Sequence, residues 1–271
     1  SGIILPMLPH KNLIPDINLT PYSIWLATVV VSGISYLSYL LKRYVFHESG
    51  TLVSGIIGGL YSSTATISVL ARKSRKASEQ EATEYVAAML LAVSMMFLRF
   101  MILILIFSRE IFLSIYPYLL IMSVVSAIVG WFIHSRQKLP KDTSVESEED
   151  DSSNPLEFKV ALIFAVLFVV FTVLTHYTLV YAGTSGLNLL SFVSGFSDIT
   201  PFILNLLQNT GSVAVLIITA CSMQAIVSNI LVNMFYALFF AGKRSKLRPW
   251  ILGGFGAVIA CNLVLLLFFY L

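Results

Sequence analysis

Two ionisable side chains lie deep inside apolar stretches of this sequence, Asp198 and Arg99. A charge at bilayer depth costs about 2.5–3.5 kcal/mol on the insertion scale, so it needs a partner, a proton or a water-filled cavity. One interpretation is a buried Asp198–Arg99 ion pair that locks a helix bundle. The other is an ion pathway, in which Asp198 attracts a cation and Arg99 sets a barrier or binds an anion.

Hydroxyl and amide side chains accompany these two charges. The predicted ion-pathway residues are Ser62, Ser63, Thr64, Thr66, Asp198, Thr200, Asn229 and Asn233, with Arg99 as their electrostatic partner. Oxygen ligands suit hard cations such as Mg²⁺, although an isolated hydroxyl can equally bond its own helix carbonyl. Because only one carboxylate is evident, a partly hydrated ion at a weak site is favoured over tightly held Mg²⁺. The identity of any metal stays open.

The sequence predicts neither an enzyme nor a bound cofactor. A zinc site needs clustered ligands, and the four histidines stand apart, without HExxH or paired CxxC motifs. Asp198 has no second membrane aspartate to form a protease dyad, and there is no Walker A loop or dinucleotide fingerprint. Cys221 and Cys261 lie in apolar runs and are typical of small core residues.

Composition places these residues in a membrane. Mean hydropathy is +0.87, 57% of residues are hydrophobic and 11% are charged, against about 25% charged in soluble domains. The partner is therefore a lipid bilayer. The formal net charge of +3 is spread over loops and argues against a nucleic-acid partner.

Eight segments can position the candidate residues. Six are continuous and long enough to span a bilayer: Ser23–Leu41, Tyr85–Phe107, Phe112–Ile133, Phe158–Tyr181, Val213–Phe240 and Trp250–Leu271. Two others are rich in helix-loosening residues, Thr51–Val69 and Leu187–Leu207. The predicted breaks are Gly55, Gly58, Gly59, Gly195 and Pro201, whose freed backbone groups must face protein or water.

Short motifs recur in order in the two halves. Val53-Ser54-Gly55 returns at Val193 after 140 residues, and Val93-Ser94 returns at Val227 after 134. We therefore expect an internal duplication: residues 1–20 as the tail of a missing upstream segment, 21–133 as membrane repeat 1, 134–154 as an acidic cytoplasmic linker and 155–271 as membrane repeat 2. Interrupted segments at matching places in two repeats indicate a transporter site.

The basic residues favour one topology. If both interrupted segments are re-entrant hairpins, fourteen Lys and Arg share one face and only Lys11 and Arg109 lie on the other, as the positive-inside rule demands. The two repeats then have opposite orientation. Tilted crossing segments remain an alternative, and the glycines and serines of Thr51–Val69 could also form a close helix-packing face, which makes a homodimer plausible.

The string Gly55-Ile-Ile-Gly-Gly-Leu-Tyr-Ser-Ser-Thr-Ala-Thr66 resembles the signature of an uncharacterised membrane domain found C-terminal to MgtC/SapB-type domains in prokaryotes. The Met95–Arg99, Gly195–Asp198 and Ser228-Asn229 segments fit the same pattern. Where that family often has Lys a few residues after Ser-Asn, this chain has Asn233. The resemblance implies a multi-pass protein of a prokaryotic cytoplasmic membrane, of a family often described as magnesium or other cation transporters.

Together these observations predict an all-α polytopic transmembrane bundle of two repeats, each of about four segments with a broken or re-entrant second segment. The predicted function is passage of a small inorganic cation through the repeat interface. The alternative is a non-transporting regulatory or scaffold module that acts with an MgtC/SapB-type domain.

Overall fold

The computed structural model describes residues 4–15, 17–45, 50–136, 158–208, 213–242 and 247–270. These residues form helices without a β-strand, apart from an isolated bridge between Ile14 and Ile17. A 3-10 helix covers Leu5–Met7 and a π-helical turn covers Leu41–Val45. The eight α-helices are α1 (Pro21–Leu40), α2 (Thr51–Ser74), α3 (Glu79–Phe107), α4 (Arg109–Ser135), α5 (Phe158–Ser194), α6 (Ile199–Gln208), α7 (Val215–Ala241) and α8 (Arg248–Tyr270).

Seven of these helices, all except α6, are long and apolar enough to cross a membrane. Together with the composition, they identify a multi-pass membrane protein. Local sequence fixes several starts: Thr20 and Ser78 form capping boxes at α1 and α3, and the Ser108 hydroxyl accepts the backbone N–H of Ile111 at α4. These caps set where the spanning segments begin.

The two ends of the bundle differ in charge. Arg72, Lys73 and Arg136 lie at one end, where α2 and α4 finish and α3 begins. The last residues of α7 join them there, because the Arg72 guanidinium lies 4.4 Å from the centre of the Phe240 ring. We call this the basic end, and the end where α3 passes into α4 the opposite end.

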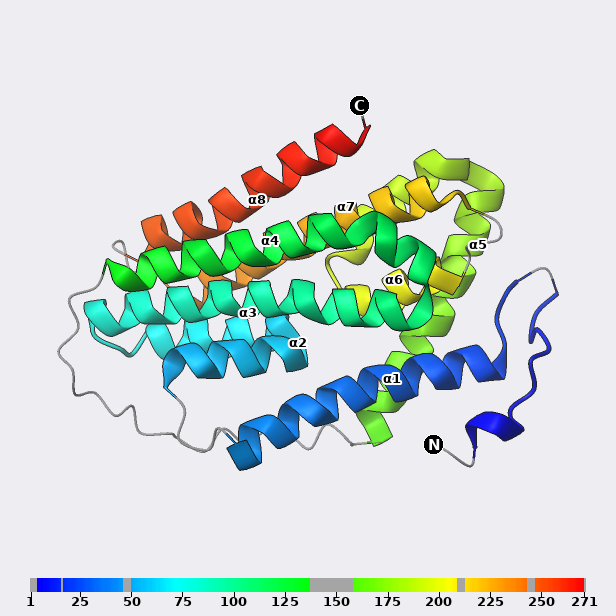
Figure 1. Ribbon diagram of the computed structural model, residues 1–271, viewed down its shortest axis with the longest axis horizontal. Helices are drawn as coiled ribbons and strands as arrows, with labels where there is room; N and C mark the ends of the chain where they lie inside the picture. Colours follow the sequence, from blue (N-terminus) through cyan, green and yellow to red (C-terminus); the bar gives the residue numbers. More distant parts are fainter. Residues whose placement is uncertain are drawn as a thin grey trace.

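α2 is a re-entrant hairpin that enters from the basic end. Its first arm runs parallel to α3, because Gly55 lies against Ala88 and Gly59 against Ala92. At Ser62 the backbone leaves the helical region, with φ −158° and ψ 107°. The position of a Cβ on Gly58 then lies 2.5 Å from the Thr66 hydroxyl, whereas eight residues of straight helix span about 12 Å. The second arm therefore turns back to the basic end, where α3 starts (Figure 1).

The second hairpin enters from the opposite end and comprises residues 184–208. α5 bends at Gly183, which has a positive φ of 58°. Its part after the bend runs parallel to α7: Asn188 contacts Cys221, and the Ser228 hydroxyl donates to the Phe192 carbonyl. A turn at 195–198 reverses the chain into α6, which returns toward the opposite end (Figure 1).

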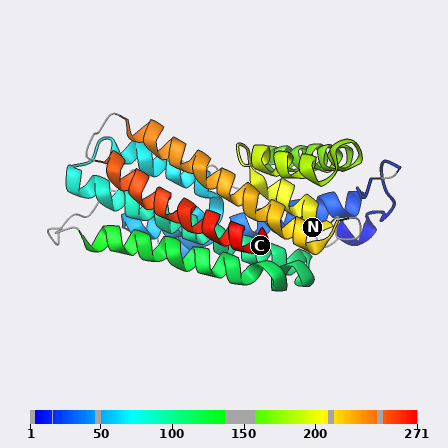
Figure 2. The same cartoon turned by 90° about the horizontal axis from the view of Figure 1, so that it is seen from above.

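The two hairpins enter from opposite ends of the bundle, and the helices fall into two sets, one around each hairpin, while the internal duplication and its bounds stay a prediction. α1, α2, α3 and α4 form the first set, and α5, α6, α7 and α8 the second. α4 and α8, the last helices of the two sets, run antiparallel where they pack, because Gly254 lies against Ile133 and the Tyr118 hydroxyl makes a buried bond to Asn262. Figure 2 shows α4 and α5 on opposite sides of the molecule, and Figure 1 shows α5 steeply inclined to α3 and α4.

Several predicted break positions are wrong. Gly55, Gly58 and Gly59 lie inside the first helical arm, and the break falls at Ser62. Pro201 is the third residue of α6, where a missing N–H costs no helical bond. Only Gly195 lies at a break. The Val-Ser-Gly match at 140 residues therefore does not join equivalent positions, since Gly55 packs within an arm and Gly195 lies at a tip.

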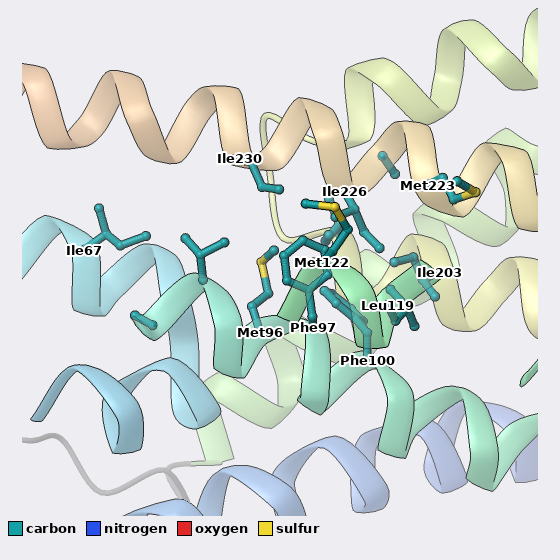
Figure 3. Packing of buried hydrophobic residues seen from close by; sticks show 14 of the residues in the cluster. Ile67, Met96, Phe97, Phe100, Leu119, Met122, Ile203, Met223, Ile226 and Ile230 are labelled. Atoms are coloured by element: carbon teal, nitrogen blue, oxygen red, sulfur yellow. The ribbon is translucent and has the colours of Figure 1, made fainter. Parts of the chain in front are cut away.

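The core lies between α3, α4, α6 and α7. Figure 3 shows Met96 and Phe97 of α3 meeting Ile226 and Ile230 of α7, with Ile203 of α6 beside them. The predicted acidic linker lies outside the described residues, except for its first three. Within residues 1–20, Ile17 and Leu19 are buried and attach this segment to the helices.

Candidate functional site

Arg99 joins the two hairpins near their tips. Its Nη1 donates to the Tyr61 carbonyl, 2.7 Å away, directly before the break in α2. Its Nη2 donates to the Thr200 hydroxyl, 3.2 Å away, in the first turn of α6. The side chain is only 9% exposed. One buried guanidinium therefore connects a hairpin from the basic end with a hairpin from the opposite end.

The Arg99–Asp198 ion pair does not form as a direct contact. Among the described residues, Arg99 bonds only neutral oxygens, no carboxylate lies within 4.0 Å of it, and its Nε has no hydrogen-bond partner. Asp198 is exposed, and its Oδ1 accepts the backbone N–H of Thr200 at 2.9 Å. The carboxylate thus stabilises the N-terminus of α6, while Arg99 stabilises the carbonyl end of the first arm of α2.

α7 carries the polar residues that face the second tip. The Asn229 amide donates to the Gly195 carbonyl at 3.2 Å, and the Asn233 amide donates to Asn229 Oδ1 at 3.1 Å. Both side chains are buried, Asn233 completely. Asn233 Oδ1 accepts no hydrogen bond from any described residue.

The hydroxyls of the first tip differ in exposure. Ser63 is buried, Ser62, Thr64 and Thr66 are half-buried, and Ala65 between them is exposed. The Ser62 hydroxyl accepts from the Ala65 backbone at 3.4 Å, as an N-terminal cap of the second arm would. The first tip therefore presents partly exposed hydroxyl groups together with the N-terminus of the second arm of α2.

A cavity of about 350 Å³ opens at the opposite end of the bundle. Its lining combines apolar side chains with the polar residues Asn12, Asn18, Thr20, Ser23 and Gln208. α3 and α6 lead from it to the tips, because Phe107 and Gln208 in the lining lie eight residues from Arg99 and Thr200, about 12 Å along a helix.

Buried apolar side chains fill the turns between this cavity and the tips. They are Leu103 and Ile104 on α3 and Ile203 and Leu204 on α6, all fully buried. The cavity therefore ends short of Arg99 in this conformation.

The structure brings the sequence-predicted residues into two connected groups. In the first group Arg99 bonds Thr200 and the carbonyl that precedes Ser62–Thr66, and Asp198 accepts the Thr200 N–H. In the second group Asn229 bonds Gly195 at the second tip, and Asn233 bonds Asn229. Sequence reasoning missed Tyr61 and Phe192, which act through backbone carbonyls that no residue type reveals. No group of three or more His, Cys, Asp or Glu suited to a metal occurs among the described residues.

Comparison with known proteins gives a family and one relative. Residues 29–241 match the family described as "Domain of unknown function (DUF4010)". An uncharacterized protein of Aquifex aeolicus (strain VF5) is 26% identical over 224 residues, which is 82% of this chain and 96% of that protein. No solved structure matches the chain.

Proposed function

This chain belongs to the DUF4010 family, and we propose that it carries a small inorganic ion across a membrane through the place where its two hairpin tips meet. The observation that carries the proposal is the bridge from Arg99 to both hairpins. Two oppositely oriented repeats with broken helices that meet near the bilayer middle are the usual design of ion-coupled transporters.

The exposure of Asp198 supports the same proposal. Neither a carboxylate nor the open turn at 195–198 is tolerated against lipid, so this tip must face water or another protein surface. A water-filled path from either end to the tip meets that demand directly. A second copy of the chain beside the path, as the sequence-based homodimer prediction has it, would shield the rest of the tip.

We propose a cation as the transported ion. Asp198 supplies a negative charge at the tip, and the surrounding ligands are oxygens of hydroxyl, amide and carbonyl groups. Arg99 binds neutral partners and adds a positive charge beside the path, which weakens cation binding enough for release. The proposed activity moves an ion and makes or breaks no covalent bond.

The proposed location is the cytoplasmic membrane of a prokaryote, with the basic end inside. Association with an MgtC/SapB-type domain belongs to the same proposal and rests on the sequence resemblance. The rival function, a regulatory module without transport, would be favoured by a dry bundle with Asp198 tied to Arg99. The exposed carboxylate, free of that ion pair, supports transport instead.

Ion flux into proteoliposomes tests this function. Purified protein is reconstituted, and uptake is measured for a panel of mono- and divalent cations and for chloride as the anion control. We expect selective cation uptake that Asp198→Asn reduces at least about tenfold, since the tip then lacks its only carboxylate. Glu110→Gln, which removes an exposed carboxylate in the first turn of α4, is the matched control and should behave as wild type.

The result is decisive in either direction. Uptake of no cation above empty liposomes, with wild type and both variants folded, would refute transport by this chain. Uptake that is equal in wild type and Asp198→Asn would place the path away from the second tip.

A further inference from the structure

Asn233 holds a buried oxygen without a donor at the second hairpin tip. The side chain is 0% exposed, and its amide N–H donates to Asn229 Oδ1. Its own Oδ1 has no hydrogen-bond partner among the described residues. A buried unpaired carbonyl oxygen costs about 1–3 kcal/mol, so a bound donor or cation at this oxygen would stabilise the folded chain.

The sequence spacing between the two halves makes Asn233 the counterpart of Arg99. Asn233 follows Arg99 by 134 residues, and Gly195 follows Tyr61 by the same number, as Val227 follows Val93. In the first repeat, Arg99 itself holds the tip carbonyl of Tyr61. In the second repeat, Asn229 holds the tip carbonyl of Gly195, which leaves the Arg99-equivalent residue free to use its oxygen elsewhere.

From these positions, and on the premise of the proposed function, we infer that Asn233 Oδ1 is a ligand in a binding site for a monovalent inorganic cation. In the first repeat the equivalent position carries its own positive charge on Arg99. In the second repeat a bound cation supplies that charge. The site belongs to α7 and the second tip, where Asn229, one helical turn before Asn233, accepts from the Asn233 amide and donates to the Gly195 carbonyl.

The ligand set selects for single charge. Amide and backbone carbonyl oxygens carry no formal charge, and they replace the hydration shell of an alkali cation as carbonyl rings do in channels. Mg²⁺ gives up water reluctantly and binds through carboxylates in near-octahedral geometry, which this set does not provide. Asp198, three residues after Gly195, supplies the balancing negative charge at the tip.

Cation-dependent stability of the purified chain tests the site without reference to flux. Thermal unfolding in detergent is followed with Li⁺, Na⁺, K⁺ or Mg²⁺ as chloride salts, each replaced at constant ionic strength by N-methyl-D-glucamine chloride. A cation that binds only the folded state raises Tm as its concentration rises. We expect this for an alkali cation and not for Mg²⁺.

Three variants assign the effect. Asn233→Leu should raise the half-saturating alkali concentration by about tenfold or more, because a buried ligand oxygen is lost. Asn233→Lys should place a tethered ammonium at the site and make Tm independent of alkali cations. Thr219→Val is the matched control, since the Thr219 hydroxyl bonds its own helix at Val215, and it should keep the wild-type response.

Two outcomes would overturn the inference: a wild-type Tm that ignores alkali cations, or an Asn233→Leu response equal to wild type. The flux experiment tests the transport function independently of this cation site. A cation response that requires Asn233, in protein that transports nothing, would keep the site and remove the transport function. Flux in protein whose Tm ignores alkali cations would keep transport and remove the site.

Discussion

A double-mutant cycle at Gly58 and Thr66 tests the reversal of α2 directly. A methyl group on Gly58 would lie 2.5 Å from Thr66 Oγ1 and 2.8 Å from its Cγ2, far inside van der Waals contact. Thr66 cannot simply rotate away, because a β-branched side chain in a helix has few χ1 choices. Gly58→Ala should therefore destabilise the protein, although Ala is the better helix former.

The magnitude follows from two opposing contributions. Overpacking costs about 1–3 kcal/mol, and the Gly-to-Ala change in helix propensity returns up to about 1 kcal/mol, so Gly58→Ala should lose about 1 kcal/mol net. Thr66→Ala removes both clashing atoms and leaves Cβ at 3.2 Å. In the Thr66→Ala background, Gly58→Ala should be neutral or stabilising, a coupling of about 1 kcal/mol or more.

Reversible unfolding in mixed detergent–SDS micelles, followed by circular dichroism, measures the four free energies. Gly59→Ala with Thr66→Ala is the control cycle, since a Cβ on Gly59 meets the Ala92 backbone and not Thr66. That cycle should be additive within about 0.3–0.5 kcal/mol. Additivity at Gly58 and Thr66 as well would refute the hairpin, because residues eight apart in a straight helix do not touch.

Two further changes test the second hairpin and the bridge between the tips. Gly183→Ala should lower the free energy of unfolding by about 1–3 kcal/mol, because φ 58° with ψ −150° is a conformation open essentially to glycine alone and no atom would crowd the new Cβ; an unchanged denaturation midpoint would contradict that backbone conformation. Arg99→Lys should lower it by about 1–3 kcal/mol and reduce flux, because an ammonium lacks the fork that reaches Tyr61 and Thr200 together; wild-type flux and stability in this variant would show that the bridge is dispensable.

The hairpin architecture could be predicted from the sequence because the placement of Lys and Arg and the positions of the interrupted segments indicate the same topology. Lys and Arg positions favour two re-entrant hairpins, and the structure has α2 and the second hairpin in those places. The break points were not accessible. Gly55 and Gly59 look like helix breakers, yet they allow α2 to touch the backbone of α3, while the break falls at Ser62, a residue type that helices tolerate.

Only part of the candidate site could be predicted from the sequence, because residue types reveal side chains and not the backbone groups that they bind. Buried charge and clustered amides mark Arg99, Asp198 and Asn229 by residue type, and all three lie at the tips. Their actual partners are largely backbone groups, the carbonyls of Tyr61 and Gly195 and the N–H of Thr200. A sequence that suggests an Asp–Arg pair cannot reveal that each charge instead stabilises a helix end.

The glycine contact between α2 and α3 makes the two repeats mechanically unequal. With no side chain between the backbones at Gly55 and Gly59, the first hairpin has no room to slide and must move with α3 as one frame. The second hairpin also meets α7 closely at Gly195 and through hydrogen bonds, but it differs from the first in having a positive-φ glycine in open space, Gly183, where α5 bends. Any gating motion should therefore belong to the second hairpin, which swings against a fixed first half.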